Sequence, residues 1–113
     1  MDSLVTLSEV EVGRAQARVE EIVRASGTTF FWAMRFMSAE KRRAMFAVYA
    51  FCRIVDDIAD DPNPLDVKKR ELARWRDEIA KLYAGRPEDP VAVALAEPGA
   101  RFGLVEADFL AVI

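Results

Sequence analysis

Apolar residues recur at three- and four-residue spacing along most of the chain, and this periodicity is the strongest constraint on its fold. It predicts a helix over residues 10–25, with Gly27 as the signal that ends it. A longer helix is expected to begin after Ser38, a favourable N-cap, and to run to about Asp61, where Pro62 stops it.

The second half of the chain continues the same pattern. Asn63 is expected to cap a third helix with Pro64 at its first position, and Gly85 is expected to close that helix. A short helix should start at residues 89–90, an Asp-Pro pair, and a last one should follow Gly103. No alternating strand pattern or internal repeat occurs in the sequence, which therefore predicts an all-α fold.

Composition excludes several functional classes. With 113 residues, 52% of them hydrophobic and 31% charged, the chain fits one globular domain. The net charge of −3 and the lack of a basic stripe with interleaved aromatics argue against nucleic-acid binding. The chain has no histidine, which removes His-based triads and most zinc sites, and its single cysteine, Cys52, suits a reducing compartment.

The sequence shows no signal for secretion or for membrane insertion. Residues 1–12 carry acids and no basic segment, so no signal peptide is predicted. The longest apolar run, residues 44–52, is about half of what a membrane span needs. We expect a cytoplasmic protein that at most lies against a membrane surface.

Two carboxylate pairs lie at the end of the second predicted helix. Asp56 and Asp60 are four residues apart and share a helix face, and Asp57 and Asp61 form a second pair. Like charges at this spacing cost about 0.2–0.5 kcal/mol per pair, and the helix dipole disfavours anions here by roughly 0.3–1 kcal/mol each. A cation would reverse both penalties, and hard oxygen ligands suit Mg²⁺.

A solvated acidic helix end is the alternative to a metal site, and for most charge runs it is the better interpretation. The residues one and two turns before Asp56 and Asp60 on the same face favour a site, because they are apolar or weakly polar: Met45, Val48, Tyr49 and Cys52. A stripe of this kind that ends in carboxylates is typical of an apolar cavity with a metal site at its mouth. Arg53 has two open interpretations, a helical ion pair with Asp56 or Asp57 or a bidentate grip on diphosphate oxygens.

Two segments carry a specific resemblance. Residues 26–35, SGTTFFWAMR, followed by residues 43–60, RAMFAVYAFCRIVDDIAD, resemble the opening of the squalene/phytoene synthase family. Within it they are most similar to the branch of bacterial presqualene diphosphate synthases of hopanoid biosynthesis. The resemblance implies the N-terminal part of an isoprenoid-synthase-type helical bundle, with residues 1–25 as an N-terminal helix and lead-in and residues 26–113 as the first portion of the catalytic domain.

The resemblance also implies roles for individual residues. Asp56 and Asp60 match the first aspartate-rich motif, which would hold Mg²⁺ against a prenyl diphosphate, and Tyr49 joins them as a catalytic residue. The implied substrate-binding residues are Ser26, Thr29, Phe30 and Arg53, and we include Asp57 with them. Four aromatic residues would shield the reaction from water, with ordinary core packing as the alternative for each: Phe30, Phe31, Trp32 and Phe51.

The implied reaction is head-to-head coupling of two farnesyl diphosphates, or of two geranylgeranyl diphosphates in the phytoene branch. Loss of one diphosphate would leave an allylic cation, so the reaction needs no protein nucleophile. Family members are well over twice as long and carry a second aspartate-rich motif on a later helix, and this sequence contains no DxxxD outside residues 56–61. We therefore expect a truncated chain that is inactive on its own.

Three further expectations accompany this interpretation. The stripe formed by Leu72, Trp75, Ile79 and Leu82 and the shorter one formed by Phe109, Leu110 and Ile113 should be exposed, and could drive self-association. A non-enzymatic helical interaction module remains open as an alternative. So does a helical scaffold with an incidental divalent-ion site.

Overall fold

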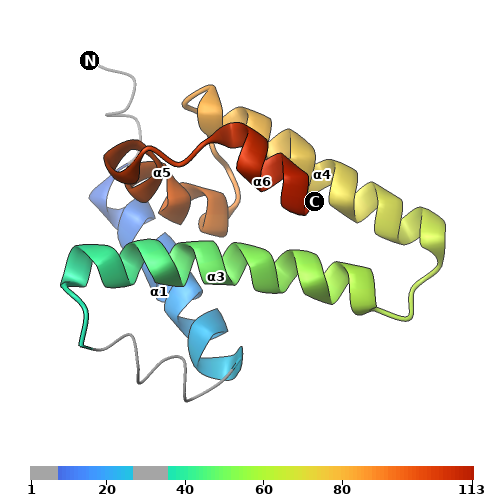
Figure 1. Ribbon diagram of the computed structural model, residues 1–113, viewed down its shortest axis with the longest axis horizontal. Helices are drawn as coiled ribbons and strands as arrows, with labels where there is room; N and C mark the ends of the chain where they lie inside the picture. Colours follow the sequence, from blue (N-terminus) through green and yellow to red (C-terminus); the bar gives the residue numbers. More distant parts are fainter. Residues whose placement is uncertain (1–7, 27–35) are drawn as a thin grey trace.

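The computed structural model describes residues 8–26 and 36–113, and within those ranges it is all-α, as predicted (Figure 1). Five helices follow one another along the chain: α1 (Glu9–Ser26), α3 (Ala39–Asp60), α4 (Leu65–Tyr83), α5 (Pro90–Phe102) and α6 (Glu106–Val112). The predicted helices agree with these bounds to within one or two residues. No helix of the described part is long and apolar enough to cross a membrane.

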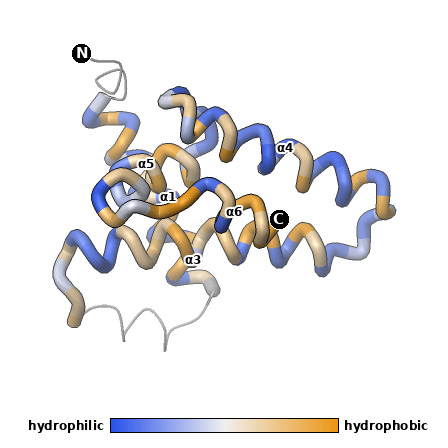
Figure 2. The backbone as a smooth tube through the Cα atoms, turned by 45° about the horizontal axis from the view of Figure 1, so that its top comes forward, coloured by the Kyte–Doolittle hydropathy of each residue, from blue (hydrophilic) through white to orange (hydrophobic). Residues whose placement is uncertain are grey.

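The two longest helices, α3 and α4, form an antiparallel hairpin that provides the frame of the molecule (Figure 1). Helix α1 crosses α3 and packs against both α3 and α5. The chain then returns through α5, and α6 lies beside α4 between the two arms of the hairpin (Figure 1). Apolar residues recur along α3 and α5, while much of α4 carries hydrophilic residues (Figure 2).

Most of the predicted helix ends have the expected chemistry. The Ser38 hydroxyl accepts a hydrogen bond from the Lys41 amide at 3.3 Å, which makes it the N-cap of α3. Asp89 caps α5 in the same way, through the Val91 amide at 2.9 Å. Gly103 ends α5 with a φ of 64°, a left-handed conformation in which a side chain would be strained. This turn directs the chain back toward α4.

The predicted start of α4 is wrong by one residue. Pro64, not Asn63, is the cap residue, and the first helical residue is Leu65. Pro64 has an extended conformation, and its carbonyl accepts the amides of Val67 and Lys68. The Asn63 amide instead donates to the Asp61 carboxylate at 3.0 Å, which forms a tight polar turn between the two helices.

Three aromatic rings form the centre of the core. Phe51 of α3 contacts Trp75 of α4 edge-to-face at 5.9 Å between ring centroids, and it contacts Phe109 of α6 at 5.2 Å. The expectation that the stripes of α4 and α6 would be exposed is therefore wrong. Trp75, Ile79 and Phe109 are buried, and the other members of the two stripes are half-buried. The reason is that α6 covers the inner face of the hairpin.

Candidate functional site

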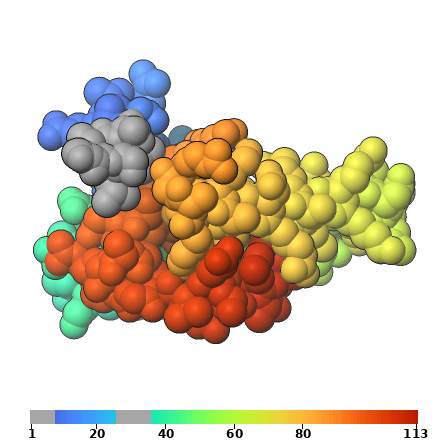
Figure 3. Space-filling view, turned by 90° about the horizontal axis from the view of Figure 1, so that it is seen from above, coloured from blue at the N-terminus to red at the C-terminus, as the bar shows by residue number. Residues whose placement is uncertain are grey.

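The carboxylates of the predicted site lie on the last two turns of α3. Asp56, Asp57 and Asp60 are all exposed. They lie near the corner where the hairpin of α3 and α4 extends past the other helices (Figures 1 and 3). The shared face that the four-residue spacing predicts for Asp56 and Asp60 is therefore open to solvent.

The residues that precede the carboxylates on this face are partly buried. Tyr49 and Cys52 are half-buried against the core cluster. Burial raises the pKa of the Cys52 thiol, and the negative charge of Asp56 raises this pKa further. Asp56 follows Cys52 by four residues on α3, so the two side chains lie one turn apart on the same face. Cys52 also lines an apolar groove of about 180 Å³ between α3 and α6, with Val48 and Val105.

Arg53 forms an ion pair in this structure. Its Nε lies 3.3 Å from the Asp57 carboxylate, and both side chains are substantially exposed. An exposed pair of this spacing contributes only a few tenths of a kcal/mol. The contact places the guanidinium beside the carboxylates. It is compatible with both the ion-pair role and the diphosphate-binding role of Arg53, because a weak pair of this kind can open to bind an anion.

The predicted substrate-binding residues before α3 lie at or beyond the end of α1. Ser26 is the last residue of α1. Thr29 and Phe30 lie outside the described residues, as do Phe31 and Trp32. Phe51, the fourth aromatic residue proposed to shield the reaction, is completely buried in the core, so it has the packing role.

The described residues fit a magnesium ion in type but supply only one side of a site. Asp56 and Asp60 offer hard oxygen atoms on one exposed face, which is the donor chemistry that Mg²⁺ prefers. Across residues 8–26 and 36–113, no group of three or more acidic or cysteine side chains is placed to hold an ion. Water, phosphate oxygens or residues elsewhere would have to complete the coordination.

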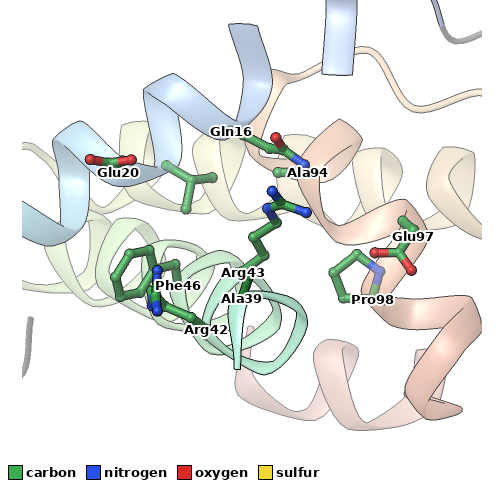
Figure 4. Close-up of a pocket in the computed structure, with 10 residues that line it drawn as sticks. Gln16, Glu20, Ala39, Arg42, Arg43, Phe46, Ala94, Glu97 and Pro98 are labelled. Atoms are coloured by element: carbon green, nitrogen blue, oxygen red, sulfur yellow. The ribbon is translucent and has the colours of Figure 1, made fainter. Parts of the chain in front are cut away.

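A polar cavity of about 260 Å³ lies at the other end of α3, between α1, α3 and α5 (Figure 4). Its lining includes Arg42, Arg43, Glu20 and Glu97. Each of these two carboxylates is paired with an arginine four residues later on its own helix, at 2.6 and 2.7 Å. Arg42 donates to the Met37 carbonyl at 3.0 Å. The charges in this cavity are largely balanced, and it is separate from the carboxylates near the corner.

Comparison with known proteins assigns the chain to a family. The squalene/phytoene synthase family matches residues 23–113. The chain belongs to the squalene/phytoene synthase family. The match includes all the carboxylates near the corner and the helices that hold them. No solved structure was found to match the chain.

Individual members of this family are similar to the chain over most of its length. The chain is 47% identical over 89 residues to the presqualene diphosphate synthase of Rhodopseudomonas palustris, an alignment that covers 79% of the chain and 32% of the relative. It is also 47% identical to the presqualene diphosphate synthase of Zymomonas mobilis, over 79% of the chain and 31% of that protein. Phytoene synthase 3 of Zea mays is 36% identical over 75% of the chain and 20% of its own length. The chain thus spans about a third or less of the length of these relatives.

Among the polar contacts that were not predicted from the sequence, two fix the turns at the ends of α4. The side chain of Lys68 on α4 donates to the Ala59 carbonyl in the last turn of α3, at 2.9 Å. Glu78 is buried, and its carboxylate accepts the amides of Glu88 and Asp89 at 2.6 and 2.9 Å, which fixes the turn into α5. Each contact joins residues at least nine positions apart in different elements, so neither leaves a periodic signal in the sequence.

Proposed function

We propose that this chain contributes the first aspartate-rich motif of a head-to-head prenyltransferase that condenses two farnesyl diphosphates to presqualene diphosphate. The observation that carries the proposal is the arrangement of Asp56 and Asp60 on one open face of α3, directly after the half-buried Tyr49 and Cys52. The 47% identity to two presqualene diphosphate synthases supports this reaction over the alternative, a phytoene-type condensation of geranylgeranyl diphosphate.

The proposed roles follow from side-chain chemistry. Asp56 and Asp60 hold Mg²⁺, which neutralises charge on the departing diphosphate. Arg53 donates to diphosphate oxygens, and the Asp57 beside it keeps the guanidinium at the site between turnovers. Tyr49 lines the diphosphate end of the pocket. The remaining proposed substrate contacts come from Ser26, Thr29 and Phe30.

The proposal extends beyond these 113 residues. The other carboxylates that complete the magnesium site belong to a part of the protein that this chain does not include, so the chain alone is inactive. The whole enzyme is cytoplasmic or peripheral to the membrane. Self-association through the stripes of α4 and α6 loses its support, because Trp75, Ile79 and Phe109 are buried. A non-enzymatic interaction module remains the competing function, and the experiment below separates the two.

The test uses a chimera in which residues 23–113 replace the matching segment of the Rhodopseudomonas palustris relative. We expect the chimera to convert farnesyl diphosphate to presqualene diphosphate only when Mg²⁺ is present. Asp56→Asn or Asp60→Asn should lower turnover at least about 100-fold, because each removes a metal ligand. Asp61→Asn is the matched control and should stay close to the unsubstituted chimera, since Asp61 lies off the shared face and an asparagine oxygen still accepts the Asn63 amide. Undiminished turnover in both metal-site variants would refute the assignment.

Arg53→Lys in the same chimera separates the two interpretations of this residue. If the guanidinium grips diphosphate, the substitution should raise KM for farnesyl diphosphate about tenfold, because an ammonium group cannot form the bidentate contact. If Arg53 only pairs with Asp57, kcat and KM should both be unchanged. The measurement is steady-state release of diphosphate across a range of substrate concentrations.

A further inference from the structure

The last turn of α3 has an unfavourable distribution of charge. The helix ends at Asp60 with acids at positions 56, 57 and 60, and no basic residue lies in its last turn. Free carbonyl groups give this end of a helix a partial negative charge, which repels carboxylates. The turn that carries Asp60 should therefore tend to fray unless another element supplies a cation.

Helix α4 supplies that cation. Lys68, which is half-buried, donates from Nζ to the Ala59 carbonyl at 2.9 Å across the hairpin corner. Ala59 is the residue directly before Asp60, so the bond holds the backbone of the turn on which the carboxylate is mounted. The corner itself is stiff, because the Asp61 carboxylate accepts the Asn63 amide. Prolines at positions 62 and 64 further restrict this connection.

We propose that Lys68 is a positioning residue for the metal site: it clamps the last turn of α3 and so fixes the geometry of Asp56 and Asp60. The proposal rests on the proposed function, because it assigns Lys68 a role in holding the same carboxylates. Lys68 contacts neither metal nor substrate in this role. It acts through the backbone of Ala59, at the end of α3 where the carboxylates and the carbonyls would otherwise repel one another.

Two possible roles of the lysine predict opposite effects on Mg²⁺ binding. If Lys68 were only a nearby positive charge, its removal would relieve repulsion and tighten Mg²⁺ binding. If it positions the carboxylates, its removal lets the turn fray and weakens Mg²⁺ binding. The neighbouring Lys69 gives the matched control, because it is exposed, carries the same charge, and its side chain makes no polar contact within the described residues.

The first measurement is amide hydrogen exchange by NMR on the 113-residue chain and its variants. Lys68→Met should speed exchange of the amides of residues 59–61 roughly two- to tenfold, the range expected for one net hydrogen bond. Amides in the middle of α3 should be unchanged. Lys68→Arg keeps a donor and a charge and should restore most of the protection, whereas Lys69→Met should have no effect. Equal exchange in Lys68→Met and the unsubstituted chain would overturn the proposal.

The second measurement is a titration with MgCl₂ in the presence of inorganic diphosphate, followed through the amide signals of Asp56 and Asp60. Lys68→Met should weaken the apparent affinity roughly two- to tenfold relative to Lys69→Met. Tighter or equal binding in Lys68→Met would show that the lysine is only a charge and would overturn the positioning role. If the unsubstituted chain shows no Mg²⁺ response, these 113 residues do not bind the ion without the rest of the site, and the exchange experiment decides whether Lys68 clamps the turn.

Discussion

The two sides of α3 contrast sharply although they belong to one helix. One side is closed: it faces α1, α4 and α5, and its buried residues are Ala47, Ala50, Phe51 and Val55. The other side is open and carries the half-buried Tyr49 and Cys52, then the exposed Asp56 and Asp60. Apolar burial stabilises the first side by about 25 cal/mol per Å² of area removed from water, while local electrostatics destabilise the second.

This contrast explains how the helix tolerates its own carboxylates. An isolated helix with three acids in its last two turns would fray, because most helical stability in proteins comes from packing rather than propensity. In α3 full burial extends to Val55, one residue before the motif begins, and Ile58 within the motif is half-buried against the core. The closed side therefore holds the carboxylates in helical register through Val55 and Ile58, and the hairpin corner holds the final turn.

The largest expected effect is on the closed side. Phe51→Ala removes the ring that contacts both Trp75 and Phe109, and we expect a loss of about 3–5 kcal/mol in the free energy of unfolding. Urea denaturation followed by circular dichroism measures this loss. Met45→Ala, on the open side and 38% exposed, is the control and should cost less than about 1 kcal/mol. Equal costs for the two variants would mean that the two sides of α3 do not differ as described.

The closed side is also where sequence reasoning succeeded best. Apolar spacing predicts the all-α fold and the five helices, and capping chemistry places their ends at Ser38, Asp89 and Gly103. The start of α4 was missed because Pro64 can either cap a helix or occupy its first position, and sequence alone does not decide which. The docking of α6 was missed because periodicity shows that a face is apolar but not which element covers it.

For the candidate site, the sequence gives positions along one helix but not contacts between helices. The four-residue spacing of Asp56 and Asp60 is enough to predict a shared face, since helical geometry is fixed. The contact of Lys68 with the Ala59 carbonyl depends on how the corner folds back, and the burial of Glu78 depends on the turn into α5. Both are consequences of tertiary structure, so they become visible only in three dimensions.

The second prediction concerns the open side, where a substitution should raise the free energy of unfolding instead of lowering it. Asp60→Asn should stabilise the 113-residue chain by about 0.5–1 kcal/mol without Mg²⁺, because it removes a like-charge pair with Asp56 and an anion at a helix C-terminus. The gain should shrink as NaCl is added, since salt screens exposed charges. Thermal melts at low and high ionic strength measure both effects. A loss of stability at low salt would show that Asp60 makes a stabilising contact instead.

The smallest expected effect lies at the boundary between the two sides, at Cys52. Burial and the charge of Asp56 raise the pKa of this thiol, so the folded chain favours the protonated form. This preference stabilises the fold below the pKa of the unfolded thiol, and the contribution is lost as pH rises through the higher pKa of the folded thiol.

Asp56→Asn should lower the pKa of the Cys52 thiol and speed its alkylation by iodoacetamide at pH 8 roughly twofold, because the thiolate is the reactive form. Asp57→Asn is the control and should leave the rate unchanged, since Asp57 pairs with Arg53. If the two variants alkylate at the same rate, Asp56 does not act on the thiol, and the apolar and acidic parts of the open side are electrostatically independent.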